Sequence, residues 1–82
     1  MTREEITQAV LVALTDVAPE TDTTTLRTDL NLRDQTDLDS MDSLNFLIAV
    51  HEQLHVDISE ADWARLMTID ELVEFVTPRV PV

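Results

Sequence analysis

A serine between aspartates, Ser40 in the stretch Asp39-Ser40-Met41-Asp42, is the residue whose surroundings most suggest chemistry. It stands where a polar segment gives way to an apolar repeat of helical spacing, so the hydroxyl lies at the start of a predicted helix. Free backbone N–H groups and the helix dipole favour an anion attached there by roughly 0.3–1 kcal/mol when it is exposed. Two interpretations follow. Either Ser40 or Asp39 merely caps the helix, which spacing alone favours, or Ser40 is a site of covalent modification.

Catalysis by Ser40 itself is disfavoured. A hydrolase of the Ser-His-Asp type needs a strand-to-helix turn and backbone N–H groups that closely approach the reacting carbonyl. No apolar strand precedes Ser40, and the chain contains no glycine to allow that approach. It also contains no cysteine, and therefore no thiolate nucleophile. We expect a protein that is not an enzyme and has no catalytic residues.

A second group that suggests chemistry is His51-Glu52-Gln53-Leu54-His55, which matches the H-E-x-x-H signature of helical zinc proteases. Helical i, i+4 spacing puts both imidazoles on one side, with the glutamate nearby as a base. However, the chain is too short to supply the second half of a substrate cleft, and His55 falls where the helix should end. A zinc-dependent hydrolase that uses His51, Glu52 and His55 is therefore a distant alternative, and we expect no metal site.

The charge of the chain limits its partners. The sequence has 17 acidic residues against 5 arginines and no lysine, for a net charge of −12. Such a chain repels nucleic acid and attracts proteins with basic surfaces. No apolar run approaches the roughly 20 residues that span a membrane, and the N-terminus resembles neither a secretory nor a transit peptide. We expect a cytoplasmic monomer with protein partners, and neither nucleic-acid nor membrane partners.

Apolar spacing and capping residues predict four helices. The first covers residues 3–17 after Thr2, the second about 40–54, a short third contains Trp63 after Ser59, and the fourth follows Thr68. The fold class is therefore all-α, a small four-helix bundle of three main helices and one short helix, in a single domain over residues 1–82.

Residues 18–38 form an unusually long connection for a compact domain. Its leucines suggest a loop that is pinned across the helices; they are Leu26, Leu30, Leu32 and Leu38. Because the chain has no glycine, a backbone position that needs a positive φ must use another residue, and Asn31 is the best candidate.

The predicted helix over 40–54 has two apolar strips. The wider strip is expected to face the core and consists of Ser43, Phe46, Leu47, Val50 and Leu54. The narrower strip consists of Met41, Leu44 and Ile48. Two interpretations stay open for it: an extension of the core or, because Asp42 and Glu52 lie near it, a half-exposed docking edge. Ser43 is therefore predicted to face inward, whereas Ser40 precedes the helix body.

Asp39-Ser40-Met41-Asp42, followed by the amphipathic helix, resembles the acyl carrier protein family, whose hallmark is Asp-Ser-Leu or Asp-Ser-Met at the start of the second helix. Residues 39–76 align with a typical carrier without a gap, and Asp29-Leu30-Asn31 looks like the family's Asp-Leu-Gly. Asp42-Ser43-Leu44 also spells Asp-Ser-Leu, but the inward position predicted for Ser43 leaves Ser40 as the modified serine.

The resemblance implies a cofactor, a function and site residues. Ser40 would carry a 4′-phosphopantetheine arm derived from coenzyme A, whose thiol holds acyl, aminoacyl or peptidyl groups as thioesters. Partners would be a phosphopantetheinyl transferase, with Asp39, Met41 and Asp42 as contacts, and later enzymes, with Leu44, Ile48 and Glu52 as contacts. These later enzymes would be acyl-transferring, condensing or adenylating enzymes of fatty-acid, polyketide or related secondary metabolism.

Some residues depart from the family pattern. Asn45 and His51 stand where glutamates are usual on the second helix, and the segment before Ser40 is longer than in common fatty-acid carriers. These departures favour a specialised rather than a housekeeping carrier. The chief alternative is an acidic helical adaptor that binds partners without a prosthetic group.

Overall fold

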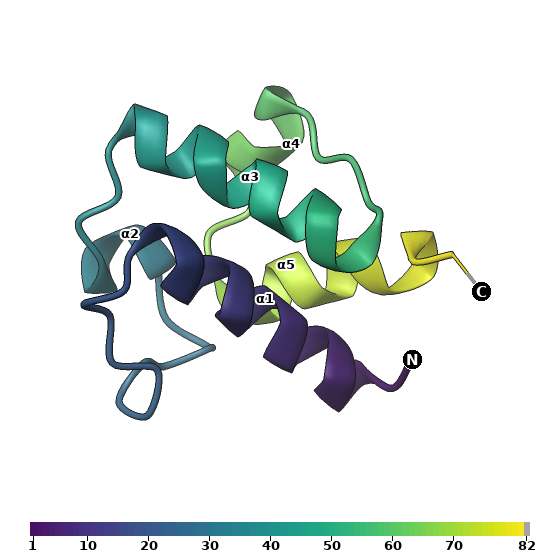
Figure 1. Ribbon diagram of the computed structural model, residues 1–82, viewed down its shortest axis with the longest axis horizontal. Helices are drawn as coiled ribbons and strands as arrows, with labels where there is room; N and C mark the ends of the chain where they lie inside the picture. The colour runs from purple at the N-terminus through teal and green to yellow at the C-terminus, as the bar shows by residue number, and fades with distance from the viewer. Residues whose placement is uncertain (82) are drawn as a thin grey trace.

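The computed structural model describes residues 1–81, which form a bundle of helices. The helices are α1 (Arg3–Val17), α2 (Leu32–Gln35), α3 (Ser40–Leu54), α4 (Glu60–Arg65) and α5 (Ile69–Val76), followed by a 3-10 turn, η1 (Thr77–Arg79). In Figure 1, α1 and α3 lie side by side and run in opposite directions, α5 lies behind them, and α1 contacts both. The predicted all-α bundle of three main helices (α1, α3 and α5) and short α4 is confirmed. None of the helices within residues 1–81 is long and apolar enough to cross a membrane.

The helices begin where the capping residues place them. Thr2 and Thr68 each accept a hydrogen bond from the backbone N–H three residues on, and Glu5 and Glu71 reach back to the threonine N–H at 2.8 and 3.1 Å. Ser59 caps α4 by accepting from the backbone N–H of Asp62 at 3.1 Å. These contacts satisfy N–H groups that have no partner inside a helix, so the predicted starts of α1, α4 and α5 are confirmed.

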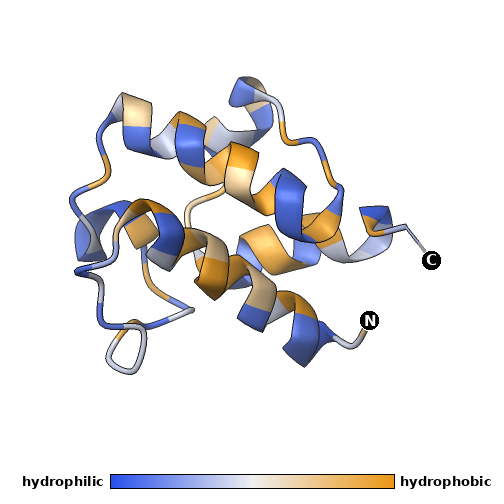
Figure 2. Cartoon of the chain, in the orientation of Figure 1, coloured by the Kyte–Doolittle hydropathy of each residue, from blue (hydrophilic) through white to orange (hydrophobic). Residues whose placement is uncertain are grey.

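The core lies between α1, α3 and α5, whose ribbons carry the hydrophobic colour over much of their length in Figure 2. Its largest fully buried side chains are Phe46, Ile6, Leu14, Leu54, Ile69, Leu72, Val10, Val50, Val73 and Val76. Within residues 1–81 no polar or charged residue is buried. A core of this kind fixes the helices by apolar burial alone, and it leaves all chemistry to the surface.

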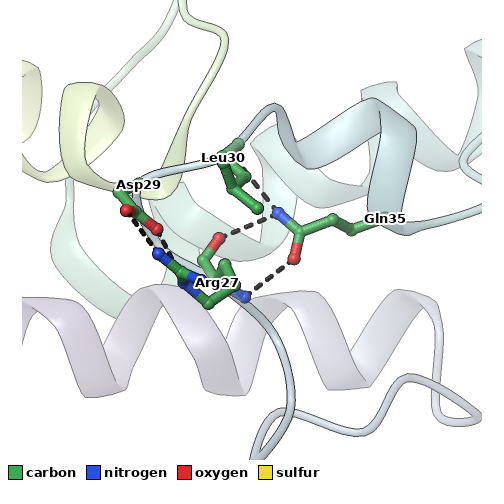
Figure 3. Close-up of polar contacts among 4 residues, drawn as sticks. All are labelled: Arg27, Asp29, Leu30 and Gln35. Atoms are coloured by element: carbon green, nitrogen blue, oxygen red, sulfur yellow. Dashed lines mark hydrogen bonds and ion pairs between the residues drawn. The ribbon is translucent and has the colours of Figure 1, made fainter.

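The long connection before α3 is organised by Gln35 (Figure 3). The Gln35 carboxamide accepts a hydrogen bond from the Arg27 N–H at 2.7 Å and donates to the Arg27 carbonyl at 2.8 Å, so it binds the backbone as a neighbouring strand would. It also donates to the Leu30 carbonyl at 3.3 Å, and the Arg27 guanidinium holds Asp29 through two hydrogen bonds. The guanidinium lowers the pKa of the Asp29 carboxyl.

Leucines also pin this connection, with one exception. Leu32 is buried in the core, and Leu26 and Leu38 pack against it, but Leu30 is 48% exposed, so the expectation for Leu30 was wrong. Helix α2 was not predicted. Its four residues are too few for an apolar repeat, and its start depends on the Asn31 side chain, which accepts a hydrogen bond from the Arg33 N–H at 2.9 Å.

The prediction of a positive φ at Asn31 is also wrong. Asn31 has φ −57°, because its backbone is that of the residue that caps α2. Among the described residues, positive φ occurs at His55 alone, with φ 57° and ψ 38°. There α3 ends, and the His55 N–H donates to the His51 carbonyl at 2.7 Å, so a left-handed residue closes the helix as glycine often does.

Candidate functional site

The N-terminus of α3 has a free serine because its neighbour does the capping. The Asp39 carboxylate accepts a hydrogen bond from the Asp42 N–H at 2.7 Å, and Asp39 has the extended backbone of a capping residue. Ser40 is the first helical residue and is exposed, and its hydroxyl has no hydrogen-bond partner within residues 1–81. The capping interpretation is therefore right for Asp39 and wrong for Ser40, whose hydroxyl remains available.

Ser43 lies less deeply than predicted. It is half-buried, whereas the other members of its strip, Phe46, Leu47, Val50 and Leu54, are buried in the core. Ser43 faces a surface hollow of about 280 Å³. We call this the serine hollow; its lining residues are Ser40, Ser43, Leu44, Leu47, Glu60 and Trp63. The two serines therefore share one hollow, with Ser40 at the exposed side of the helix and Ser43 one turn further in.

A second hollow continues along α3. This outer hollow, of about 230 Å³, shares Leu44, Leu47 and Glu60 with the serine hollow and ends near Ile58. At its far end the His51 Nδ1 lies 3.0 Å from an Asp57 carboxylate oxygen, a contact that links α3 to the segment before α4. Two adjoining hollows therefore lie along α3, the first at Ser40 and the second reaching His51.

The predicted docking edge is on the surface. Met41, Leu44 and Ile48 are 70%, 48% and 49% exposed, and exposed apolar residues that adjoin one another in this way are typical of an interaction site. Asp39 and Glu52 are also exposed, and Asp42 is half-buried. Leu44, Ile48 and Glu52 follow Ser40 at four-residue spacing and so lie on or near its side of α3. Asp39, Met41 and Asp42 are its neighbours in the chain.

This face carries the acidic residues Asp39, Asp42 and Glu52, and α3 itself contains no arginine or lysine. Between Arg33 and Arg65 the chain has no arginine or lysine, and Arg65 itself is paired with Asp62. Hydrogen bonds from Arg65 and from Ser59 lower the pKa of Asp62. The face can therefore attract a basic protein surface over distances of about 8–10 Å, the range that salt leaves unscreened.

The H-E-x-x-H residues do not form a zinc site. His55 has left-handed backbone at the end of α3, so the helical i, i+4 register that would align it with His51 is broken. The two rings lie edge to face with centroids 6.3 Å apart, and His51 is bound to Asp57. Within residues 1–81 no three potential metal ligands cluster. The zinc-hydrolase alternative has no support in this geometry.

Two residues of the site carried no signal in the sequence. Glu60 lines both hollows, but nothing in its spacing distinguishes it from the other acids of α4. Arg33 lies 30 residues from Trp63 in the chain, yet its guanidinium stacks 4.4 Å from the centre of the indole ring. Only the folded chain brings Glu60 to the hollow that Ser40 lines and Arg33 to Trp63 of α4.

Comparison with known protein families gives one match. A family model described as "Phosphopantetheine attachment site" matches residues 7–76, which is most of the chain. Among curated proteins, none matches.

The residues at the start of α3 fit such an attachment. An exposed serine hydroxyl without a hydrogen-bond partner adjoins a hollow open to solvent, and no cysteine competes to supply a thiol. Domains of this family are carriers rather than catalysts, and they work with a phosphopantetheinyl transferase and with enzymes that handle acyl groups. The adaptor without a prosthetic group is thereby set aside. The chain belongs to the phosphopantetheine attachment-site family, that of the acyl carrier proteins, and its cofactor is covalently bound 4′-phosphopantetheine.

Proposed function

We propose that Ser40 is the residue that carries the arm, in a single carrier domain over residues 1–82. The observation that supports this assignment is that Asp39, and not Ser40, caps α3. The Asp39 carboxylate accepts the hydrogen bond from the Asp42 N–H, so the exposed Ser40 hydroxyl is not needed as the cap and can react without loss of a structural hydrogen bond. Ser43 is a poorer candidate because it is half-buried and lies within the helix body.

In the attachment reaction, the Ser40 Oγ forms a bond to the phosphorus of coenzyme A that bears pantetheine. The pyrophosphate bond of coenzyme A breaks, and adenosine 3′,5′-bisphosphate leaves with the electron pair, while the serine proton passes to a base of the transferase. The new phosphodiester keeps one negative charge at the helix N-terminus, where the dipole and the free N–H groups favour an anion. When bound, the arm supplies the thiol that holds acyl, aminoacyl or peptidyl groups as thioesters, a group that this cysteine-free chain lacks.

The surface along α3 is the proposed docking face for partner enzymes. Asp39, Met41 and Asp42 surround the attachment serine and would contact the transferase. Leu44, Ile48 and Glu52 lie further along the helix and would contact the later enzymes. An exposed apolar strip beside acidic groups fits partners whose docking surfaces combine an apolar patch with arginine or lysine.

The proposed role is a discrete carrier for enzymes of fatty-acid, polyketide or related secondary metabolism, whether acyl-transferring, condensing or adenylating. His51 and Asn45 are exposed on α3 at positions where the family usually has glutamates, so this face is less negative than in a typical carrier. This difference supports dedicated partners over those of general fatty-acid synthesis. We propose that the carrier acts as a monomer in the cytoplasm.

Intact-mass spectrometry tests the attachment site. The apo-protein is incubated with coenzyme A and a phosphopantetheinyl transferase, and one arm per chain is expected. Ser40→Ala should abolish the mass increase completely, while the matched control Ser43→Ala should retain it. A mass increase that persists in Ser40→Ala and disappears in Ser43→Ala would reassign the site to Ser43.

A further inference from the structure

Trp63 lines the serine hollow and also another hollow, beside α2 and α4. This arginine hollow, of about 520 Å³, is lined by Asn31, Arg33, Asp34, Trp63, Ala64 and Met67. Trp63 is the one residue that lines both hollows, and it is only 8% exposed. The indole therefore forms the wall between them.

The wall is held from two sides. On the α3 side the indole meets the Phe46 ring edge to face, with centroids 5.5 Å apart and planes inclined at 63°. On the other side the Arg33 guanidinium stacks on the indole at 4.4 Å. Such aromatic and cation–π contacts fix the ring in place beyond what apolar burial provides.

Arg33 also fixes the backbone of α4. Its two terminal nitrogens donate to the carbonyl oxygens of Trp63 and Leu66, at 2.8 and 2.9 Å. These carbonyls lie at the C-terminal end of α4, where a cation is favoured, and the Trp63 carbonyl also accepts a hydrogen bond from the Leu66 N–H at 3.1 Å. One arginine thus holds both the indole and the helix that carries it.

We infer that Trp63 limits the length of the acyl chain that this carrier can shelter, and that Arg33 is the positioning residue that keeps this limit in place. The inference depends on the proposed attachment at Ser40, because the serine hollow is where a chain on that arm would enter. With the indole present, the chain can occupy only the serine hollow and the open outer hollow beside it. The cargo class is therefore a short acyl chain. Without the indole, the serine and arginine hollows would join, and a longer chain could pass between α3 and α4.

The test loads Ser40 with a series of saturated acyl chains from two to twelve carbons, using acyl-coenzyme A and a phosphopantetheinyl transferase, and compares melting temperatures with the arm-bearing protein. Each methylene that leaves water adds stability, so the melting temperature should rise with chain length and then level off. In Trp63→Leu the melting temperature should keep rising to longer acyl chains before it levels off. In Arg33→Met the chain length at which the melting temperature levels off should also increase, but by a smaller amount, because the indole remains and is less firmly held.

A second aromatic–arginine pair supplies matched controls. Arg79 stacks 3.8 Å from the centre of the Phe75 ring, far along the chain from Ser40 and lining none of these three hollows. Phe75→Leu and Arg79→Met should lower stability in general but leave the chain length at which stabilisation levels off unchanged. This readout distinguishes a wall from an ordinary packing residue.

Trp63 is the single tryptophan in the sequence, so its fluorescence provides a measurement on the unmutated protein. Its emission should shift as the chain lengthens to the levelling point and change no further beyond it. If the wild-type melting temperature rises steadily to twelve carbons, or if Trp63→Leu levels off at the wild-type length, the inference fails while the attachment at Ser40 stands. If no arm is added at Ser40, the proposed function fails and the inference fails with it.

Discussion

The N-termini of α3 and α5 satisfy the same backbone requirement with different side chains. At α5 the Thr68 hydroxyl accepts the hydrogen bond from the N–H of Glu71 at 3.0 Å, and Glu71 returns one to Thr68. At α3 the Asp39 carboxylate accepts from Asp42, and the adjacent Ser40 hydroxyl is left without a partner. A hydroxyl at a helix start is thus structural in one place and free in the other. The difference shows that the neighbouring residue decides whether such a serine is available for modification.

The largest effect on stability should come from replacing Thr68 with alanine, and the same replacement at Ser40 provides the comparison. Thr68→Ala removes the capping box of α5 and should lower the free energy of unfolding by about 1–2 kcal/mol. Ser40→Ala should change it by less than about 0.5 kcal/mol, because its hydroxyl has no structural partner and alanine favours a helix. Urea unfolding of the apo-proteins measures both. Equal losses for the two variants would mean that Ser40 also has a capping role.

A somewhat smaller effect is expected at Asp39, and two variants separate its cap from its charge. Asp39→Ala should cost about 1 kcal/mol of stability, since the Asp42 N–H loses its acceptor. Asp39→Asn retains an acceptor and should cost only the charge–dipole part, about 0.3–1 kcal/mol. If a basic surface of the transferase is attracted to the Asp39 carboxylate, Asp39→Asn should also slow attachment of the arm at Ser40 at low salt. The rate should fall less at high salt, where ions screen the attraction. An unchanged rate at both salt concentrations would argue against Asp39 as a contact.

The smallest effect should appear in acid, at the capping box of α1. Hydrogen bonds from the Thr2 backbone and side chain lower the pKa of Glu5 below its ordinary value of 4.5. A carboxyl group whose pKa is lowered by folding stabilises the fold at pH values above its ordinary pKa. This contribution is lost as the pH falls through the lowered pKa. Glu5→Gln keeps a hydrogen-bonding side chain without the titration. The melting temperature of the wild type should therefore fall relative to Glu5→Gln below about pH 4, and parallel curves down to pH 3 would contradict this.

Much of the fold followed from local sequence because helix starts are local. Thr2, Ser59 and Thr68 each cap a helix, and in the helices after Thr2 and Thr68 apolar residues also recur at helical spacing. The structure has α1, α4 and α5 where these signals predict them. The same spacing identified the exposed strip of Met41, Leu44 and Ile48, since a helix presents its residues at fixed angles. Membership of a phosphopantetheine-carrying family also followed from the residues around Ser40.

Errors arose where a residue's role depends on distant partners or on a few residues only. Asn31 was expected to adopt a positive φ, but its side chain caps α2, a helix too short to leave a periodic pattern. His55 adopts the left-handed backbone conformation because α3 ends there. The H-E-x-x-H pattern gave no sign of this conformation, since it describes two histidines within one helix. Leu30 looked like its buried neighbours, yet the path of the loop leaves it in solvent.

The sequence by itself therefore determined the helices, the negative charge and the family, because each depends on residues close together in the chain. Tertiary structure alone decided how the start of α3 is used and what surrounds it. Asp39 rather than Ser40 became the cap, and Arg33 came to lie against Trp63 from 30 residues away. Contacts of that kind form only when α2, α3 and α4 pack together, since no local spacing specifies which side chains then share a hollow.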